Sequence, residues 1–179
     1  ALKKLEWLDW VTRAASMDIR IDPASRSHVD ESLEIKTDLG VFTGQISIPP
    51  SARAIVLLPD EGQRHSPPAQ RLKNRSTARL VAATAWLEAR LPDDGFRCGY
   101  LATVAAGAAA LVAASRHGSI GAVVLWGGRP ELAGRVVAEV LAPVLLIVGA
   151  GDKPLVDANR SVLVQLTRSQ LCELRVVAG

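Results

Sequence analysis

Hydrophobic residues form three short unbroken runs in the second two-thirds of the chain. These runs cover residues 54–58, 122–126 and 144–148, and glycine or proline lies next to each of them. Short apolar runs of this kind are typical of strands that are buried on both faces of a parallel sheet. Residues 99–101 and 174–177 are weaker strand candidates. The pattern therefore predicts a largely parallel sheet in this part of the chain.

Helical periodicity marks the stretches between these runs. Residues 70–90 place Leu80 and Leu87 on one face of a predicted helix. The alanine-rich residues 104–116 predict a second helix, and residues 156–168 predict a third. This alternation of strands and helices indicates βαβ units with right-handed crossovers.

The region before the first apolar run has a different pattern. Residues 34–36 and 41–48 alternate between apolar and polar side chains, with Gly40 at the expected turn. Such alternation predicts an antiparallel hairpin with one face in water. We therefore predict an α/β protein with a mainly parallel sheet, an N-terminal antiparallel hairpin and helices on both faces.

The chain divides into an N-terminal amphipathic helix over residues 1–17, a polar linker over 18–32 and the α/β domain over 33–179. Apolar residues at spacings of three and four share one face of the helix: Leu2, Leu5, Leu8, Val11 and Ala15. This spacing is that of a helix with one buried side. Trp7 and Trp10 flank the stripe.

Two roles for this helix fit its pattern. It packs on its own domain, or it docks on a protein partner or a second copy through Trp7 and Trp10. Its polar face mixes acids and bases, which argues against binding to a membrane surface.

Charge and cysteine content limit the classes of function. The net charge is +3, and the basic residues are scattered rather than clustered, so no nucleic-acid partner is expected. Cys98 and Cys172 both lie in apolar runs, which favours buried free thiols in the reducing cytoplasm. No apolar run approaches the roughly 18 residues that a membrane span needs. No signal-peptide pattern opens the chain, because charged residues interrupt its first apolar stretch.

No cofactor or metal site is expected. The sequence contains neither a Gly-x-Gly-x-x-Gly segment after a strand nor a Walker A sequence. Its histidines, His28, His65 and His117, are isolated from one another and from the two cysteines, without the spacing of zinc ligands.

Four segments in order carry a resemblance to a known family. They are Arg-His-Ser-Pro at 64–67, Gly-Tyr at 99–100, Gly-Gly-Arg-Pro-Glu-Leu-Ala-Gly at 127–134, and the strand end at 147–152. From about residue 33 onward, the chain resembles the dienelactone-hydrolase-like branch of the α/β-hydrolases, including members fused to phosphoribosyltransferases. The resemblance implies an α/β-hydrolase fold and a serine nucleophile on a sharp turn after a strand.

The nucleophile position has lost its chemistry. The family sequence is Gly-x-Ser-x-Gly, in which the glycines permit the strained turn that exposes the serine. Alignment from Gly99 places Val104 at the serine position, with Ala102 and Ala106 at the glycine positions. Valine has no nucleophilic atom. Thr103 would need a shift of one residue and a base within hydrogen-bond reach to replace the serine.

The other catalytic parts have also changed. Asp60, Glu61 and Gly62 stand at the oxyanion loop, where carboxylates would repel a developing negative charge. Asp152 matches the family acid, although a helix-capping role is the simpler interpretation. The resemblance places the catalytic histidine after the last strand, and no histidine follows residues 174–177 here.

One βα unit of the family pattern is missing between residue 68 and the helix near residue 80. Either the sheet closes up across the gap, or the unit lies in a segment that this sequence lacks. We therefore predict a catalytically inactive α/β-hydrolase-like domain that binds proteins or serves in assembly. Two alternatives stay open: an esterase whose catalytic residues lie partly in absent segments, and a small-ligand binder that uses the vestigial pocket.

Overall fold

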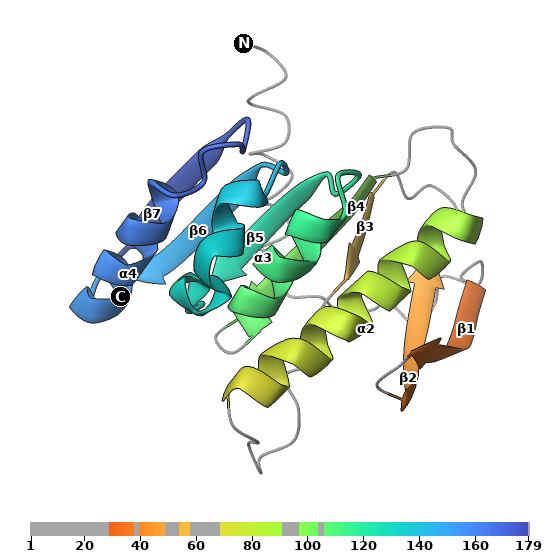
Figure 1. The fold of residues 1–179 in the computed structure, drawn as a ribbon. Coiled ribbons are helices and arrows are strands. Elements are labelled where there is room, and N and C mark those ends of the chain that lie inside the picture. The colour runs from red at the N-terminus through yellow and green to blue at the C-terminus, as the bar shows by residue number, and fades with distance from the viewer. Residues whose placement is uncertain are drawn as a thin grey trace.

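The structure is a computed structural model that describes residues 29–37, 40–48, 54–57, 69–90, 97–103 and 106–178. The strands are β1 (Val29–Thr37), β2 (Gly40–Ile48), β3 (Ala54–Leu57), β4 (Arg97–Thr103), β5 (Ala122–Trp126), β6 (Val144–Gly149) and β7 (Cys172–Val177). The helices are α2 (Ala69–Arg90), α3 (Gly107–Arg116), the 3-10 helix η2 (Pro130–Glu139) and α4 (Lys153–Leu163) (Figure 1). Strands and helices alternate from β3 onward, which confirms the predicted α/β fold.

β1 and β2 form the predicted antiparallel hairpin, separate from the main sheet. Their register runs from Val29 opposite Ile48 to Thr37 opposite Gly40. β1 therefore begins inside the predicted linker 18–32, because its first residues have partners at the far end of β2. Gly40 opens β2 instead of forming the turn.

The main sheet is parallel, and its strand order is β3-β4-β5-β6-β7. β3 pairs directly with β4, with Ala54 opposite Arg97 and Leu57 opposite Tyr100. β4 therefore supplies β3 with a hydrogen-bonding partner along one of its edges.

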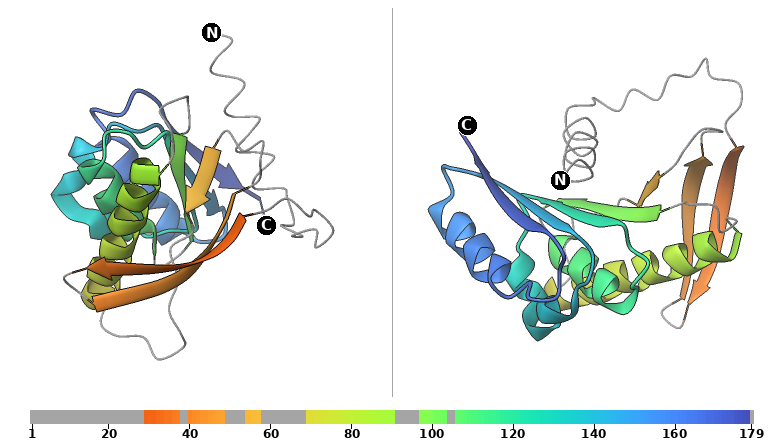
Figure 2. Two further views of the ribbon diagram at one scale, coloured as in Figure 1. Left: turned by 90° about the vertical axis from the view of Figure 1, so that its right-hand side faces the viewer. Right: turned by 90° about the horizontal axis from the view of Figure 1, so that it is seen from above.

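All of the described helices lie on one face of this sheet (Figures 1 and 2). The strand order explains this arrangement. A parallel strand–helix–strand connection is right-handed, so a chain that adds each new strand on the same side places every connecting helix on the same face. The prediction of helices on both faces therefore differs from the described part of the chain. Helices change faces only where the strand order reverses, and here the order does not reverse.

The core lies between the sheet and these helices. Small side chains of α3 allow the helix to approach the sheet closely, because Ala110 and Ala113 have no exposed surface. Facing them are Leu125 in β5 and Leu146 in β6, both fully buried in the same cluster. The alanine-rich composition of the sequence thus suits a helix packed against strands with larger aliphatic side chains.

A second, smaller cluster lies on the opposite face of the sheet. It consists of Val124, Leu145 and Ile147, with the partly buried Leu101 packed against them. Because side chains alternate between the two faces of a strand, these residues point away from α2, α3, η2 and α4.

Candidate functional site at the carboxyl edge of the sheet

Open α/β sheets bind their ligands beyond the carboxyl ends of the strands, usually in the crevice where the strand order reverses. The structure describes three of the predicted site residues there: Ala102, Ala106 and Asp152. The others lie outside the described residues: Val104, Asp60, Glu61, Gly62, Trp7 and Trp10. Among the strands that the structure describes, the order β3-β4-β5-β6-β7 does not reverse, so these strands form no such switch point.

The two alanines that flank position 104 are packed into the core. Ala102, near the end of β4, is 1% exposed, and Ala106, just before α3, is 2% exposed. Both belong to the main hydrophobic cluster. A hydrolase elbow uses glycine at these positions because its backbone is sharply turned. Here each position carries a methyl group that is buried in the core. Core packing therefore fixes the residues on both sides of the vestigial nucleophile position.

Glycines join the start of α3 to the loop after β5. A Cβ atom on Gly107 would lie 3.2 Å from the Cα atom of Gly128, so the two backbones approach too closely for a side chain to fit without a shift. Gly127 has a φ of 63°, a conformation that glycine adopts without strain. In the Gly-Gly pair of the 127–134 segment, Gly128 therefore permits the close approach of the two backbones, and Gly127 permits the left-handed conformation of the loop.

Asn159 adds a contact that the sequence did not reveal. This residue of α4 has no exposed surface. Its amide nitrogen donates to the backbone oxygens of Gly128 at 3.2 Å and Leu155 at 2.9 Å. The side chain therefore fixes α4 to the loop after β5. An isolated asparagine in a helical segment carries no sequence signal for such a role.

Asp152 is the N-cap of α4. Its Oδ1 atom accepts a hydrogen bond from the backbone N–H of Leu155 at 3.0 Å, and Pro154 occupies the first turn. A capping carboxylate and a proline are both favourable at a helix start. This start explains why α4 begins at Lys153, before the predicted range 156–168. The Asp152 carboxylate, which stands at the family's acid position, therefore caps the N-terminus of α4.

Replacing Asp152 tests this capping role. We expect Asp152→Ala to lower the free energy of unfolding by about 0.5–2 kcal/mol, because a helix N–H loses its acceptor. Asp152→Asn should keep most of the stability, since asparagine caps equally well. Urea denaturation measures both changes. Asp157→Ala is the matched control on the same helix, because Asp157 makes only exposed ion pairs, which contribute about 0–1 kcal/mol. Equal losses for the two alanine variants would rule out a dominant cap.

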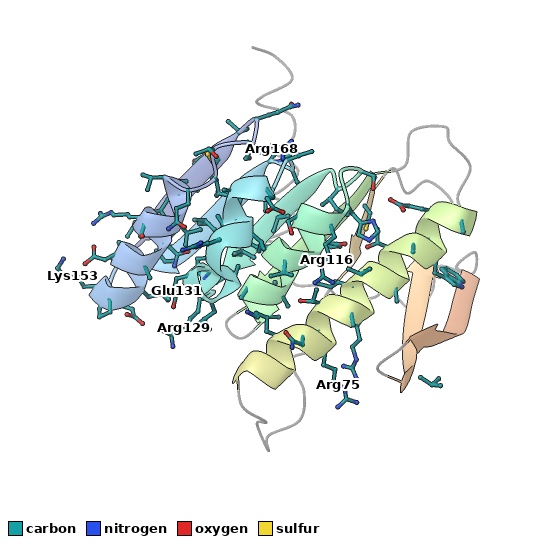
Figure 3. The ribbon with its side chains drawn as sticks, viewed as in Figure 1. Arg75, Arg116, Arg129, Glu131, Lys153 and Arg168 are labelled. Carbon is teal, nitrogen blue, oxygen red and sulfur yellow. The ribbon has the colours of Figure 1, made fainter. Side chains whose placement is uncertain are left out.

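Charged side chains at this edge pair with one another. Figure 3 shows Arg129, Glu131 and Lys153 there. The Nε atom of Arg129 donates to Glu131 at 2.7 Å, and Lys153 pairs with Asp157 at 3.2 Å. These pairs are largely exposed, and each has a neighbour of opposite charge.

The one histidine in the described ranges lies at the other edge of the sheet. His117 follows the last residue of α3, and a ten-residue helix separates it from the vestigial site by about 15 Å. Its Nδ1 atom lies 3.9 Å from a carboxylate oxygen of Glu88, and the Ser119 hydroxyl donates to the other oxygen. In a catalytic triad the serine would contact the histidine instead. This group is therefore not arranged for nucleophilic catalysis.

Cys98 is a second potential nucleophile, and it is held in its unreactive form. Burial is the main cause that raises the pKa of its thiol to about 11, with the Glu88 carboxylate adding to the effect. A hydrogen bond with Thr84 acts in the opposite direction, and its effect is larger than that of Glu88 but smaller than that of burial. The thiolate is the reactive form of cysteine, so this thiol is inert near neutral pH.

The pH dependence of alkylation tests this protonation state. We expect the rate of Cys98 modification by iodoacetamide to rise about tenfold per pH unit from pH 8 to 10, because the thiolate fraction keeps growing below the pKa. Mass spectrometry of the Cys98 peptide measures the rate. A plateau near pH 9 would contradict a raised pKa.

Two further searches of the described residues gave no site. Within the described ranges, no three His, Cys, Asp or Glu side chains come together in a way that could hold a metal ion. Among the helices of those ranges, none combines the length and hydropathy that crossing a membrane requires.

The chain is similar to known proteins in sequence and in structure, although it matches no family as a whole. No protein-family model matches the chain. Two Mycobacterium tuberculosis proteins, each named "Putative phosphoribosyl transferase", are 39% identical to it over 103 residues. That match covers 57% of this chain and 23% of each relative, so the chain spans about a quarter of the relatives' length.

Solved structures match over a larger share of the chain. A dienelactone hydrolase from Anabaena variabilis is 26% identical, with a TM-score of 0.67 over 84% of this chain and 86% of that one. An esterase of Pyrococcus furiosus has the same TM-score at 14% identity, over 86% and 84% of the two chains, and shows the fold alone. Together with the parallel sheet and the hairpin, these matches show that the chain has the α/β-hydrolase fold in the form found in dienelactone hydrolases.

Proposed function

We propose that this chain is an α/β-hydrolase-like domain without esterase activity, and that it binds proteins or serves in assembly. One observation carries the proposal. Ala102 and Ala106 stand on either side of Val104, where the family has an elbow of two glycines and a serine, and both methyl groups are buried in the core. A turn built in this way has neither the nucleophilic atom nor the backbone freedom of the elbow.

The neighbouring features agree with this proposal. Asp152 is engaged as a helix cap, and the sheet lacks the strand reversal where such folds form their ligand crevice. The same missing reversal counts against the alternative of a small-ligand binder in the vestigial pocket.

The catalytic half of the proposal is tested by restoring the missing nucleophile. We expect Val104→Ser to hydrolyse p-nitrophenyl acetate no faster than the unchanged chain or the matched variant Val104→Ala. A serine alone lacks the base and the oxyanion donors that give it reactivity. Turnover by the serine variant well above that of Val104→Ala would contradict the proposal.

The binding half concerns Trp7 and Trp10. Tryptophan side chains are frequent anchors of protein interfaces. We expect Trp7→Ala/Trp10→Ala to weaken capture of a partner or self-association at least tenfold, with the circular dichroism spectrum unchanged. Binding assays and light scattering compare this variant with Lys3→Ala/Arg13→Ala, which alters charge on the same helix. Equal binding by both variants would show that the two tryptophans do not contribute to the interface.

A further inference from the structure

β7 is the last of the described strands in the sheet, and those strands leave one of its edges without a partner (Figures 1 and 2). The N–H of Val144 donates to the Leu171 oxygen and that of Ala150 donates to the Val177 oxygen, both at 2.8 Å. Backbone groups alternate in direction along a strand, so the odd-numbered residues direct their N–H and C=O groups at β6. Three residues of β7 therefore direct theirs to the unpaired edge: Cys172, Leu174 and Val176.

Few of the features that usually protect such an edge are present in β7. Proteins protect their edge strands with proline, bulges or charged side chains, because an exposed edge readily accepts another strand. β7 contains no proline, and its register against β6 continues over six residues without a bulge. Val176 and Val177 at its end are 44% and 47% exposed. The edge is therefore suited to the addition of a strand, and the side chains of β7 decide which strand fits.

The charges of β7 are complementary to those of a second copy of the same strand. Glu173 and Arg175 stand next to Leu145 and Ile147 of β6, on the same face of the sheet, and the Arg175 Nε atom donates to Glu173 at 2.8 Å. In an antiparallel pair centred on Leu174, each Glu173 lies opposite the Arg175 of the other copy. Opposite charges at facing positions stabilise a pair of strands. We infer that the chain forms a two-fold symmetric dimer in which β7 pairs with β7 of a second copy in this register.

The backbone and the apolar side chains of β7 fit the same register. It places Leu174 opposite Leu174 of the second copy and Cys172 opposite Val176, so the groups directed at the edge form hydrogen-bonded pairs. Cys172 and Leu174 pack against the main core, so the pairing extends that apolar layer into the second copy. The exposed Val176 then lies beside Cys172 of the other copy, and the exposed Val177 lies opposite Leu171.

The neighbouring registers lack this complementarity. A pair of strands centred on Glu173 would place two glutamates opposite one another, and a pair centred on Arg175 would do the same with two arginines. Like charges directly opposite one another are destabilising. Centres at Cys172 or Val176 would leave both charged residues opposite uncharged ones. The charge pattern therefore selects the register centred on Leu174.

Charge reversal in the full chain tests the inference, with analytical ultracentrifugation as the measurement. We expect the unchanged chain to dimerise, and Arg175→Glu and Glu173→Arg each to weaken dimerisation at least tenfold, because like charges then face one another. An equimolar mixture of the two variants should dimerise again, since every glutamate then faces an arginine. Arg129→Glu is the matched control: it breaks an Arg–Glu pair of the same spacing away from β7, and it should leave dimerisation unchanged. A monomeric unchanged chain, or a dimer that Arg175→Glu leaves intact, would overturn the inference.

Disulfide cross-linking tests the register and does not rely on the charge variants. Val176→Cys is introduced into a chain that keeps Cys172 and carries Cys98→Ala, and diamide is added as the oxidant. Cys172 of one copy should join the introduced cysteine of the other, because hydrogen-bonded pairs have Cα atoms about 5.5 Å apart, within the range of a disulfide. Within one chain the two positions are about 13 Å apart along the strand, which is too far.

Val177→Cys is the matched control for the cross-link, because its side chain points to the opposite face of the sheet. We expect it to give no covalent dimer. Equal cross-linking of the two variants, or none with Val176→Cys, would overturn the inference. Neither measurement involves esterase activity, Trp7 or Trp10, so the inference and the proposed function fail separately.

Discussion

Leu146→Ala is expected to lower the free energy of unfolding by about 2–5 kcal/mol. Leu146 lies at the centre of β6 with no exposed surface, between Leu125 of β5 and Leu174 of β7. The alanine removes buried methyl groups and leaves a cavity that strands fixed by hydrogen bonds on both sides cannot close. Domains of this size are stable by only about 5–15 kcal/mol, so the loss is a large share of the total. Urea denaturation followed by circular dichroism measures it.

Leu141→Ala is the matched control for this prediction. The same side chain is removed a few residues earlier, but Leu141 is 41% exposed. We expect a change below about 1 kcal/mol, because surface substitutions away from caps and cores have small effects. Similar losses for the two leucines would show that β6 is not the centre of the core.

Thr84→Val is expected to cost about 1–3 kcal/mol of stability by leaving a buried hydroxyl without a partner. Thr84 and Tyr100 are 0% and 1% exposed, and their hydroxyl oxygens lie 2.6 Å apart. The Thr84 hydroxyl donates to the Leu80 backbone oxygen at 2.8 Å, so Tyr100 is the donor in the hydroxyl pair. Valine keeps the shape of threonine and removes the acceptor that Tyr100 needs.

A double-mutant cycle isolates this contact. Because Tyr100→Phe removes the stranded donor, Thr84→Val/Tyr100→Phe should lose less stability than the two single variants added together. Residues in direct contact typically show coupling of about 0.5–3 kcal/mol. Strict additivity would mean that the hydroxyl pair does not stabilise the fold.

The sequence predicted the fold well because its signals are local. The strands at 122–126 and 144–148 stand out as unbroken apolar runs, and the helix at 70–90 stands out by its periodicity. Their predicted bounds lie within one residue of those of β5, β6 and α2. The direct pairing of β3 with β4 could not be predicted from the sequence. Strand order is a long-range property, and no local pattern encodes it.

The candidate site was harder to predict. The alignment identified Ala102 and Ala106, and packing adds that both are buried in the core. From the sequence, Asp152 could be either a vestigial acid or a helix cap. The hydrogen bond from the Leu155 N–H shows that it is a cap. Asn159 gave no signal, because its partner Gly128 is distant in the sequence.

The fold and the proposed loss of catalysis have a common physical origin. The described strands follow one another without reversal, so all described helices lie on one face of the sheet. Our proposal of a domain without catalysis agrees with this order, because open α/β sheets usually bind ligands where the strand order reverses.

Labelling with a fluorophosphonate probe tests the central claim most directly. The probe reacts with an activated serine or threonine, whichever position supplies it. Our account predicts that the folded full-length chain shows no more labelling than the heat-denatured chain. Stoichiometric labelling of a single serine or threonine in the folded chain, lost on denaturation, would show a working nucleophile and contradict the account.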